Sequence, residues 1–296
     1  MLNCKEVDGT HIKYPAVKEA FEKAGIDMVK SPDHFTPIVW WDGDIKNKDY
    51  EYVSSSQRIN KIPGMDIICF KNTTIHALNQ MRRMFPNYYR FFPISYLLPH
   101  QFNDLQSAHR YFQSRSKQPV TWIVKPRNGC CGNGIKLVQH LFELSHKTEP
   151  LVVQKYIPPY LVDGYKFDFR FYILISTLAP YTVYIYKEGL ARFCTHKYTP
   201  PTAATINDKY SHLTNTSINK GNIETKDQNF TRLASTVLAE IEEKNPKKGP
   251  GLWKKICDAA MFSLLAIWPS IVSSLSNPSS GRPILSRRPF SSDERA

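Results

Sequence analysis

Between Gly164 and Arg170, charged and aromatic residues alternate without a break. Successive side chains of a β-strand point to opposite faces of its sheet. As a strand, this segment therefore places Lys166, Asp168 and Arg170 on one face and its phenylalanines on the other. Three charges of mixed sign in a row are unusual on a plain surface strand, but they suit a sheet that floors a polar cleft. The segment predicts a long strand over residues 167–177, with a binding cleft on its charged face.

The composition indicates a globular chain with an acidic partner. Its 296 residues suffice for two or three small domains, and 42% of them are hydrophobic. The net charge of +13 favours nucleic acid, an anionic membrane or an acidic protein, and charge alone does not choose among these. None of the six cysteines forms a C-x-x-C pair or a zinc-site spacing, which predicts reduced thiols in an intracellular protein.

Hydropathy gives no sign of a membrane segment. The apolar part of the longest uncharged run, Ala259 to Leu275, is shorter than the ~20 residues of a membrane span, and it favours a buried helix over a membrane segment. The first residues contain no apolar signal segment. We therefore expect a chain without a membrane partner.

Hydrophobic periodicity outlines the elements of the chain. Helices are predicted over residues 15–24, 74–85, 103–113, 229–243 and 253–268. Strands are predicted over residues 37–41, 121–125, 134–139, 151–156, 181–186 and 190–194, and the last two flank a hairpin turn at Lys187–Gly189. Residues 91–99 are expected to be extended, residues 199–219 irregular and the Ser-, Pro- and Arg-rich residues 277–296 disordered.

A glycine-bearing loop over residues 128–135 is a candidate phosphate site. Its three glycines let backbone N–H groups approach an anion without a Cβ in the way. The loop lacks the ending of a P-loop and the third glycine of a dinucleotide fingerprint, so a plain hairpin turn is the alternative. Lys125 ends the preceding apolar strand, where an ammonium group is costly unless it meets an anion. A lysine that reaches solvent from the strand end is the other interpretation.

Eight segments carry a family resemblance in their order and spacing: residues 57–64, 91–99, 122–126, 132–135, 153–157, 163–170, 188–193 and 212–220. From about Val39 to Leu275, the chain resembles the tubulin tyrosine ligase-like enzymes. The resemblance implies an α/β chain of the ATP-grasp fold. Its implied parts are an N-terminal α+β domain (1–100), a central ATP-grasp domain (101–160), an incomplete C-terminal ATP-grasp domain (161–276) and a disordered tail (277–296).

The resemblance also implies roles for single residues. Those that bind ATP are Lys125 at the phosphates, Cys131, Gly132, Asn133, Gly134 and Ile135 as the lid, Gln154, Lys155, Tyr156 and Ile157 along the adenine, largely through backbone groups, Lys166, Phe167 and Asp168 at adenine and ribose, and Thr214 and Asn215. Those assigned to catalysis or to the amino acid are Arg192, Arg170, Thr216, Ser217 and Lys220. Arg192 is expected at the γ-phosphate, the acyl phosphate or the amino-acid carboxylate, because phosphoryl transfer needs positive charge where negative charge develops.

By the same resemblance, the chain is expected to be an ATP-dependent ligase that joins an amino acid to a tubulin carboxylate through an acyl phosphate. Glutamate is favoured, because residues 166–170 and 213–220 resemble the polyglutamylating branch, while glycine and tyrosine stay open. The implied partners are the acidic C-terminal tails of tubulin or microtubules and no nucleic acid, since no nucleic-acid module is present. The implied protein is a cytoplasmic monomer on the cytoskeleton, in the cilium, flagellar axoneme or basal body.

The sequence departs from the family pattern in two places. Asn133 stands where the family commonly has Arg or Lys, so one phosphate-facing charge is missing. Family members continue into strands with an Asp and a Glu-x-Asn that hold Mg²⁺. No corresponding Asp or Glu-x-Asn follows Leu275. Residues 243–245 match Glu-x-Asn, but they lie at a predicted helix end and not in a strand. We therefore assign no metal ligand and expect a truncated member: an alternative transcript, a frameshifted reading or a degenerate copy.

Other interpretations of the same residues stay open. Asp168 and Arg170 are two apart on one strand face and are able to pair with each other. Arg192 is an exposed hairpin cation in the simplest interpretation, and Lys220 a solvated loop lysine. A basic cluster, which either faces acidic tails or is merely solvated, comprises Lys244, Lys247, Lys248, Lys254 and Lys255. For the whole chain, the rival function is an inactive family member that only binds nucleotide or microtubules.

Overall fold

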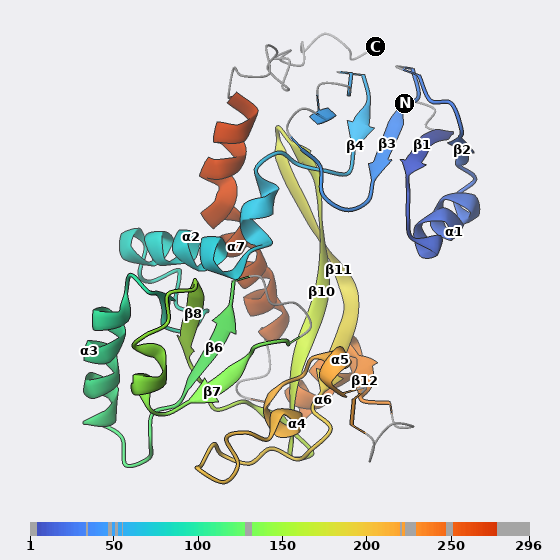
Figure 1. Cartoon of the computed structure of the whole chain (residues 1–296). Helices are drawn as coiled ribbons and strands as arrows, with labels where there is room; N and C mark the ends of the chain where they lie inside the picture. The colour runs from blue at the N-terminus through green and yellow to red at the C-terminus, as the bar shows by residue number, and fades with distance from the viewer. Residues whose placement is uncertain are drawn as a thin grey trace. The chain divides into compact units, whose positions relative to one another are not determined.

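The structure is a computed structural model that describes residues 5–33, 35–46, 49–50, 53–54, 56–127, 132–219, 221–222, 229–246 and 251–276. It contains two compact units, one of Met1–Cys69 with Ile267–Ala296 and one of Phe70–Ala266. Each unit combines helices with a sheet (Figure 1). The chain is therefore an α/β protein, as the sequence predicts.

The first unit is built on a parallel sheet of four short strands in the order β2-β1-β3-β4. The strands are β1 (Glu6–His11), β2 (Asp27–Val29), β3 (Ile38–Trp41) and β4 (Arg58–Ile59), and α1 (Pro15–Lys23) connects the first two. After β3, the buried Asp42 accepts hydrogen bonds from the backbone N–H of Lys13 and from Nε1 of Trp40, which fixes the entry to α1. The sequence predicts α1 and β3, but not β1, β2 and β4, which lack a clear apolar alternation.

The second unit contains an antiparallel sheet in the order β5-β8-β6-β7. Its strands are β5 (Ser95–Leu98), β6 (Trp122–Pro126), β7 (Lys136–Val138) and β8 (Leu151–Lys155). Helices α2 (Lys71–Met84) and α3 (Phe102–Gln113) pack against it, and a 3₁₀ turn, η3 (Leu141–Leu144), follows β7 (Figure 1). The fully buried Trp122 lies in its core and donates from Nε1 to Nδ1 of His109 at 3.0 Å.

The second sheet of this unit is dominated by a long hairpin. Strands β9 (Leu161–Val162), β10 (Tyr165–Leu178), β11 (Tyr181–Phe193) and β12 (Thr231–Leu233) follow the order β12-β11-β10-β9. Helix α6 (Ala234–Lys244) packs on β11, and the short helices α4 (Lys209–His212) and α5 (Thr216–Asn219) follow the hairpin. Phe167 and Phe169 pack into the core cluster around Val237. The predicted core face of β10 is thereby confirmed for these two residues, but it is wrong for Ile173, which is 42% exposed.

The predicted turn at Lys187–Gly189 is wrong, because β11 runs through it. Gly189 lies opposite Phe171, whereas Ile185 lies opposite Ile173, so β11 carries extra residues in a bulge between them. A Cβ on Gly189 would stand 2.4 Å from the carbonyl oxygen of Arg170. The glycine thus marks close backbone approach within a strand.

Two predicted helix bounds are also wrong. Residues 231–233 form β12 and pair with Leu190–Arg192 of β11, so α6 begins only at Ala234. Helix α7 (Leu252–Ser276) continues past Pro269 instead of ending at Trp268. By length and composition, α7 is the one helix among the described residues that meets the criterion for a membrane span. Core helices of soluble proteins meet the same criterion, so α7 by itself assigns no membrane location.

Candidate functional site

Lys125 is a partly buried lysine at the end of β6. Its Nζ donates to Oε1 of Gln154 on the neighbouring strand β8 at 2.6 Å. Burial, together with the positive charges of Lys166 and Lys71, lowers the pKa of Lys125 to about 8. The ammonium is directed toward Gln154 on β8, although the residue keeps some solvent exposure. Its charge has only a neutral amide as partner.

Lys166, on the charged face of β10, is in a similar position. Its Nζ donates to the backbone oxygen of His212 at 2.6 Å and to the hydroxyl of Tyr156 at 3.1 Å. Burial lowers the pKa of Lys166, although Asp168 opposes this shift. In the part of the chain that the structure describes, neither Lys125 nor Lys166 forms an ion pair. Two partly buried ammonium groups without an ion-pair partner fit an anionic ligand, and a polyphosphate supplies enough charge for both.

Asp168 and Arg192 face each other across β10 and β11 and form a bidentate ion pair. Nε and Nη2 of Arg192 each donate to a carboxylate oxygen of Asp168 at 2.8 Å, and Oγ1 of Thr214 donates to the same carboxylate at 2.6 Å. These hydrogen bonds raise the pKa of Arg192. Asp168 therefore does not pair with Arg170, which is exposed opposite Leu190. Arg192 is not an exposed cation either, because only 21% of its side chain is accessible.

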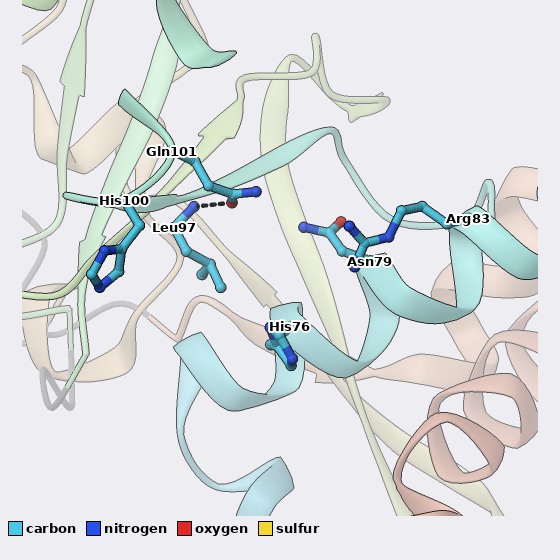
Figure 2. Close-up of a pocket in the computed structure, with 6 residues that line it drawn as sticks. All are labelled: His76, Asn79, Arg83, Leu97, His100 and Gln101. Atoms are coloured by element: carbon cyan, nitrogen blue, oxygen red, sulfur yellow. Dashed lines mark hydrogen bonds between the residues drawn. The ribbon is translucent and has the colours of Figure 1, made fainter. Parts of the chain in front are cut away.

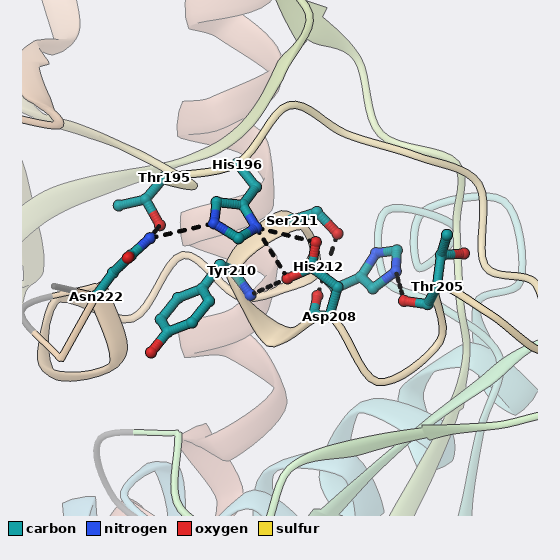
Figure 3. A network of polar contacts seen from close by, with 8 residues as sticks. All are labelled: Thr195, His196, Thr205, Asp208, Tyr210, Ser211, His212 and Asn222. Atoms are coloured by element: carbon teal, nitrogen blue, oxygen red, sulfur yellow. Dashed lines mark hydrogen bonds and ion pairs between the residues drawn. The ribbon is translucent and has the colours of Figure 1, made fainter. Parts of the chain in front are cut away.

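The segment after β11 folds back onto the charged face of β10 through a polar network (Figure 3). Nδ1 of His196 contacts the carboxylate of Asp208 at 3.1 Å, and Asp208 also accepts from the backbone N–H of Tyr210 at the start of α4. Nδ2 of the buried Asn222 donates to Oγ1 of Thr195 at 3.0 Å and contacts Nε2 of His196. These contacts tie both ends of the segment to the end of β11.

His212 is a buried residue of the same segment. Its imidazole is buried, and Nε2 lies 3.2 Å from the backbone oxygen of Thr205 (Figure 3). On the other side of the ring, Nδ1 lies 3.2 Å from the hydroxyl of Tyr156. Burial lowers the pKa of His212 and raises the pKa of Tyr156. The fold of the segment thus brings the backbone oxygen of His212 to Lys166. Sequence reasoning assigned no role to His196, Asp208, His212 or Asn222.

The glycine loop lies against α5. Gly132 and Gly134 have φ angles of +85° and +71°, a left-handed backbone that favours glycine. A Cβ on Gly132 would stand 2.4 Å from Cδ1 of Ile218 and 3.1 Å from the side chain of Asn215. The predicted lid therefore contacts the segment that carries the predicted amino-acid residues Thr216 and Ser217, which are both exposed.

The remaining predicted site residues on the strands fall into two groups, with side chains that face the site or that lie on the opposite face. Gln154 and Tyr156 present their side chains toward Lys125 and Lys166, respectively. Nζ of Lys155 lies 3.6 Å from the centre of the Phe112 ring, and Phe167 packs in the aromatic core, so their side chains leave the site. Asn133 and Ile157 are exposed, and Ile135 is half-buried. Cys131 and Lys220 lie outside the described residues.

A divalent cation finds no ready site among these residues. No group of three or more His, Cys, Asp and Glu side chains lies together within the described ranges. Residues 243–245 end α6, as predicted, and Nδ2 of Asn245 donates to the hydroxyl of Tyr160. No residue of the described ranges is therefore assigned to a metal, and no step of the proposed reaction involves one.

Comparison with known families agrees with this fold. The family model described as the tubulin-tyrosine ligase family matches residues 47–281, which is more than half of the chain. The chain belongs to this family, and the resemblance seen in its sequence is confirmed.

Individual relatives carry more specific names. The chain is 33% identical to the tubulin polyglutamylase ttll6 of Danio rerio, 36% identical to a probable beta-tubulin polyglutamylase of Tetrahymena thermophila and 31% identical to the human tubulin polyglutamylase TTLL7. Each match covers 88% of this chain, but only 33%, 22% and 28% of the respective relative. The chain thus spans a third or less of the length of these curated relatives.

Proposed function

We propose that this chain is a tubulin-modifying ligase of the ATP-grasp fold, which uses ATP to join glutamate to a tubulin carboxylate. The observation that carries the proposal is the pair of partly buried lysines, Lys125 and Lys166, neither of which forms an ion pair within the described residues. Membership of the tubulin-tyrosine ligase family supports the ligase class, and the names of its polyglutamylase relatives support glutamate over glycine and tyrosine.

The first half of the proposed reaction is a phosphoryl transfer. An oxygen of the tubulin carboxylate attacks the γ-phosphorus of ATP, the bond to the β,γ-bridging oxygen breaks, and ADP leaves. Lys125 and Lys166 neutralise the phosphates, and the backbone N–H groups around Gly132 and Gly134 cover them. The site lowers the barrier mainly by positioning and charge compensation, because phosphoryl transfer requires little covalent chemistry from a protein.

In the second half, the amine of glutamate attacks the acyl carbon of the acyl phosphate. The C–O bond to phosphate breaks, inorganic phosphate leaves, and the amine nitrogen loses a proton. Asp168 engages Nε and Nη2 of Arg192, so Nη1 is left to meet the acyl phosphate or the carboxylate of the incoming glutamate. Thr214 holds Asp168 in turn, which fixes the guanidinium in one orientation.

The proposed setting follows from the proposed substrate. A chain with a net charge of +13 attracts the acidic C-terminal tails of tubulin, and this attraction weakens as salt screens it. We propose a monomer that acts on microtubules in the cytoplasm, including those of cilia, flagellar axonemes or basal bodies. Of the basic cluster, Lys244 is paired with Glu240 and Lys254 with Asp258, while Lys247 and Lys248 lie outside the described residues.

The deciding experiment incubates the chain with microtubules, Mg²⁺-ATP and radiolabelled glutamate, with labelled glycine and labelled tyrosine in parallel reactions. The proposal expects incorporation of glutamate that depends on ATP and is lost in Arg192→Gln. Incorporation of glycine or tyrosine instead would correct the amino acid but keep the ligase class. ATP or microtubule binding without incorporation would replace the ligase by an inactive, binding-only family member.

A further inference from the structure

We propose that Ser95 and Asn79 are positioning residues for the nucleotide site, because they hold Gln154 in the orientation that stabilises the ammonium of Lys125. The inference rests on the proposed function for the identity of the ligand, ATP. Neither Ser95 nor Asn79 is among the site residues that the family resemblance implies. The four residues form a chain of hydrogen bonds that runs from α2 through β5 and β8 to β6, and we call it the relay.

The first contact of the relay fixes one amide. The ammonium of Lys125 has only donors, so it must be met by Oε1 of Gln154, which lies 2.6 Å away. The other end of the amide, Nε2, then needs an acceptor, because Gln154 is only 6% exposed. That acceptor is Oγ of Ser95 at 2.9 Å, on the strand that pairs with β8 at this register.

The second contact gives the relay its direction. Oγ of Ser95, whose residue is 5% exposed, donates its own proton to the backbone oxygen of Pro93 at 2.8 Å. Its lone pairs therefore face the amide of Gln154. Nδ2 of Asn79 on α2 donates to the backbone oxygen of Ser95 at 3.1 Å and holds this residue in place. If the amide of Gln154 rotated, its NH₂ group would face the ammonium of Lys125 and repel it.

The charges around Lys125 make this orientation consequential. The groups that act on it are Lys166 from β10 and Lys71 at the start of α2, and both are positive. Its only acceptor within the described residues is Oε1 of Gln154. Loss of this acceptor lowers the affinity of Lys125 for its proton, and a neutral amine binds phosphate poorly.

The relay ends at a pocket that supplies a matched control (Figure 2). Asn79 lines this pocket of about 300 Å³ together with His76, Arg83, Leu97, His100 and Gln101. His76 is exposed on the same helix, one turn before Asn79, and Figure 2 shows its side chain apart from that of Asn79. His76→Ala therefore alters the pocket without removing a hydrogen bond of the relay.

Two measurements on the full chain test the proposal. NMR of ¹³Cε-labelled lysine, with the Lys125 signal assigned from Lys125→Arg, follows the protonation of Lys125 without nucleotide. Calorimetry gives the affinity for ATP at pH 6.5 and pH 8.5. The variants are Ser95→Ala and Asn79→Ala, with Ser95→Thr to restore the hydroxyl and His76→Ala as the control.

In Ser95→Ala we expect the pKa of Lys125 to fall below its wild-type value. ATP affinity should drop about tenfold at pH 8.5 and little at pH 6.5, where Lys125 stays protonated. Asn79→Ala should lower the pKa of Lys125 by a smaller amount. Ser95→Thr should restore the wild-type pKa and ATP affinity, and His76→Ala should leave both unchanged.

An unchanged pKa of Lys125 in Ser95→Ala would overturn the relay, and so would an equal loss of ATP affinity at both pH values. Should Ser95→Ala not fold, Asn79→Ala alone decides on the same two readouts. A shifted pKa in a chain that binds no ATP would confirm the relay and overturn the proposed function. The two failures are thereby distinct.

Discussion

The two sheets of the larger unit treat their buried charges in opposite ways. In the sheet of β10 and β11, Arg192 meets Asp168 through two hydrogen bonds of 2.8 Å, so charge cancels charge within the fold. In the sheet of β6 and β8, Lys125 meets only the neutral amide of Gln154. A paired charge fixes geometry, whereas an uncompensated one lowers stability until a ligand arrives. The difference suggests that the Asp168–Arg192 pair orients the substrates, whereas Lys125 binds the phosphates.

The strongest way to break this comparison is to remove the uncompensated charge. Lys125→Met keeps the length of the side chain and deletes its ammonium. We expect ATP affinity to fall at least about a hundredfold, because a buried charge-assisted contact to phosphate is lost. Calorimetric titration with ATP measures this loss. Lys136→Met, in the same sheet but exposed and paired with Glu143, is the control and should bind ATP like the wild type.

The same substitution should stabilise the unliganded fold. The pKa of Lys125 is lowered to about 8 from 10.5, so the folded state disfavours its charged form below about pH 8. Lys125→Met should therefore raise the free energy of unfolding by roughly 1–3 kcal/mol at pH 7. The gain should shrink above pH 9, where the folded wild type has already released this proton. Urea unfolding at pH 7 and pH 9.5 measures the gain in stability and its decrease with pH. A lower free energy of unfolding for Lys125→Met than for the wild type at pH 7 would show that the charge of Lys125 is compensated within the fold.

Removal of one partner from the compensated pair should have the opposite effect. Asp168→Asn leaves Arg192 partly buried without its counter-charge and should cost about 1 kcal/mol of stability, since both side chains retain some solvent contact. A double-mutant cycle with Arg192→Gln isolates the interaction. A coupling energy near zero would mean that the sheet of β10 and β11 does not depend on this pair.

The smallest expected effect is the pH dependence of ATP affinity in the wild-type chain. ATP affinity should weaken progressively as pH rises through about 8, because free Lys125 loses its proton there. A change of several-fold between pH 7 and pH 9 is expected, and it should be absent in Lys125→Arg, whose guanidinium stays charged. A flat profile in the wild type would move the pKa of Lys125 out of this range.

The sequence predicts the parts of the site that depend on local pattern. The alternation of residues 166–170 places Lys166 and Asp168 on one face, and the structure has them so. The position of Lys125 at the end of an apolar strand correctly indicates an ammonium that needs a partner. The strand and helix cores of the second unit follow the same kind of signal, within a few residues at their ends.

Other parts depend on contacts between residues far apart, which no local pattern encodes. Thr214 reaches Asp168, and His212 reaches Lys166, across 46 residues of chain in each case. The backbone approach at Gly189 is another example, because a glycine that follows two charged residues has the composition of a turn. Lys155 and Phe167 show a different limit of sequence comparison. A segment that matches a family motif also contains residues whose side chains lie on the opposite face of the strand, away from the site.

The far half of the β10–β11 hairpin has one more consequence. Beyond Phe171 in β10 and before Gly189 in β11, each strand pairs only with the other among the described residues, whereas the near half also joins β9 and β12. In a two-stranded antiparallel ribbon, every second amide points outward to water instead of to a partner. Hydrogen exchange along residues 172–186 should therefore alternate between slow and fast amides, except at the register shifts and at the turn at residues 179–180. This alternation gives a residue-by-residue record of whether a bound chain has added a strand to either edge.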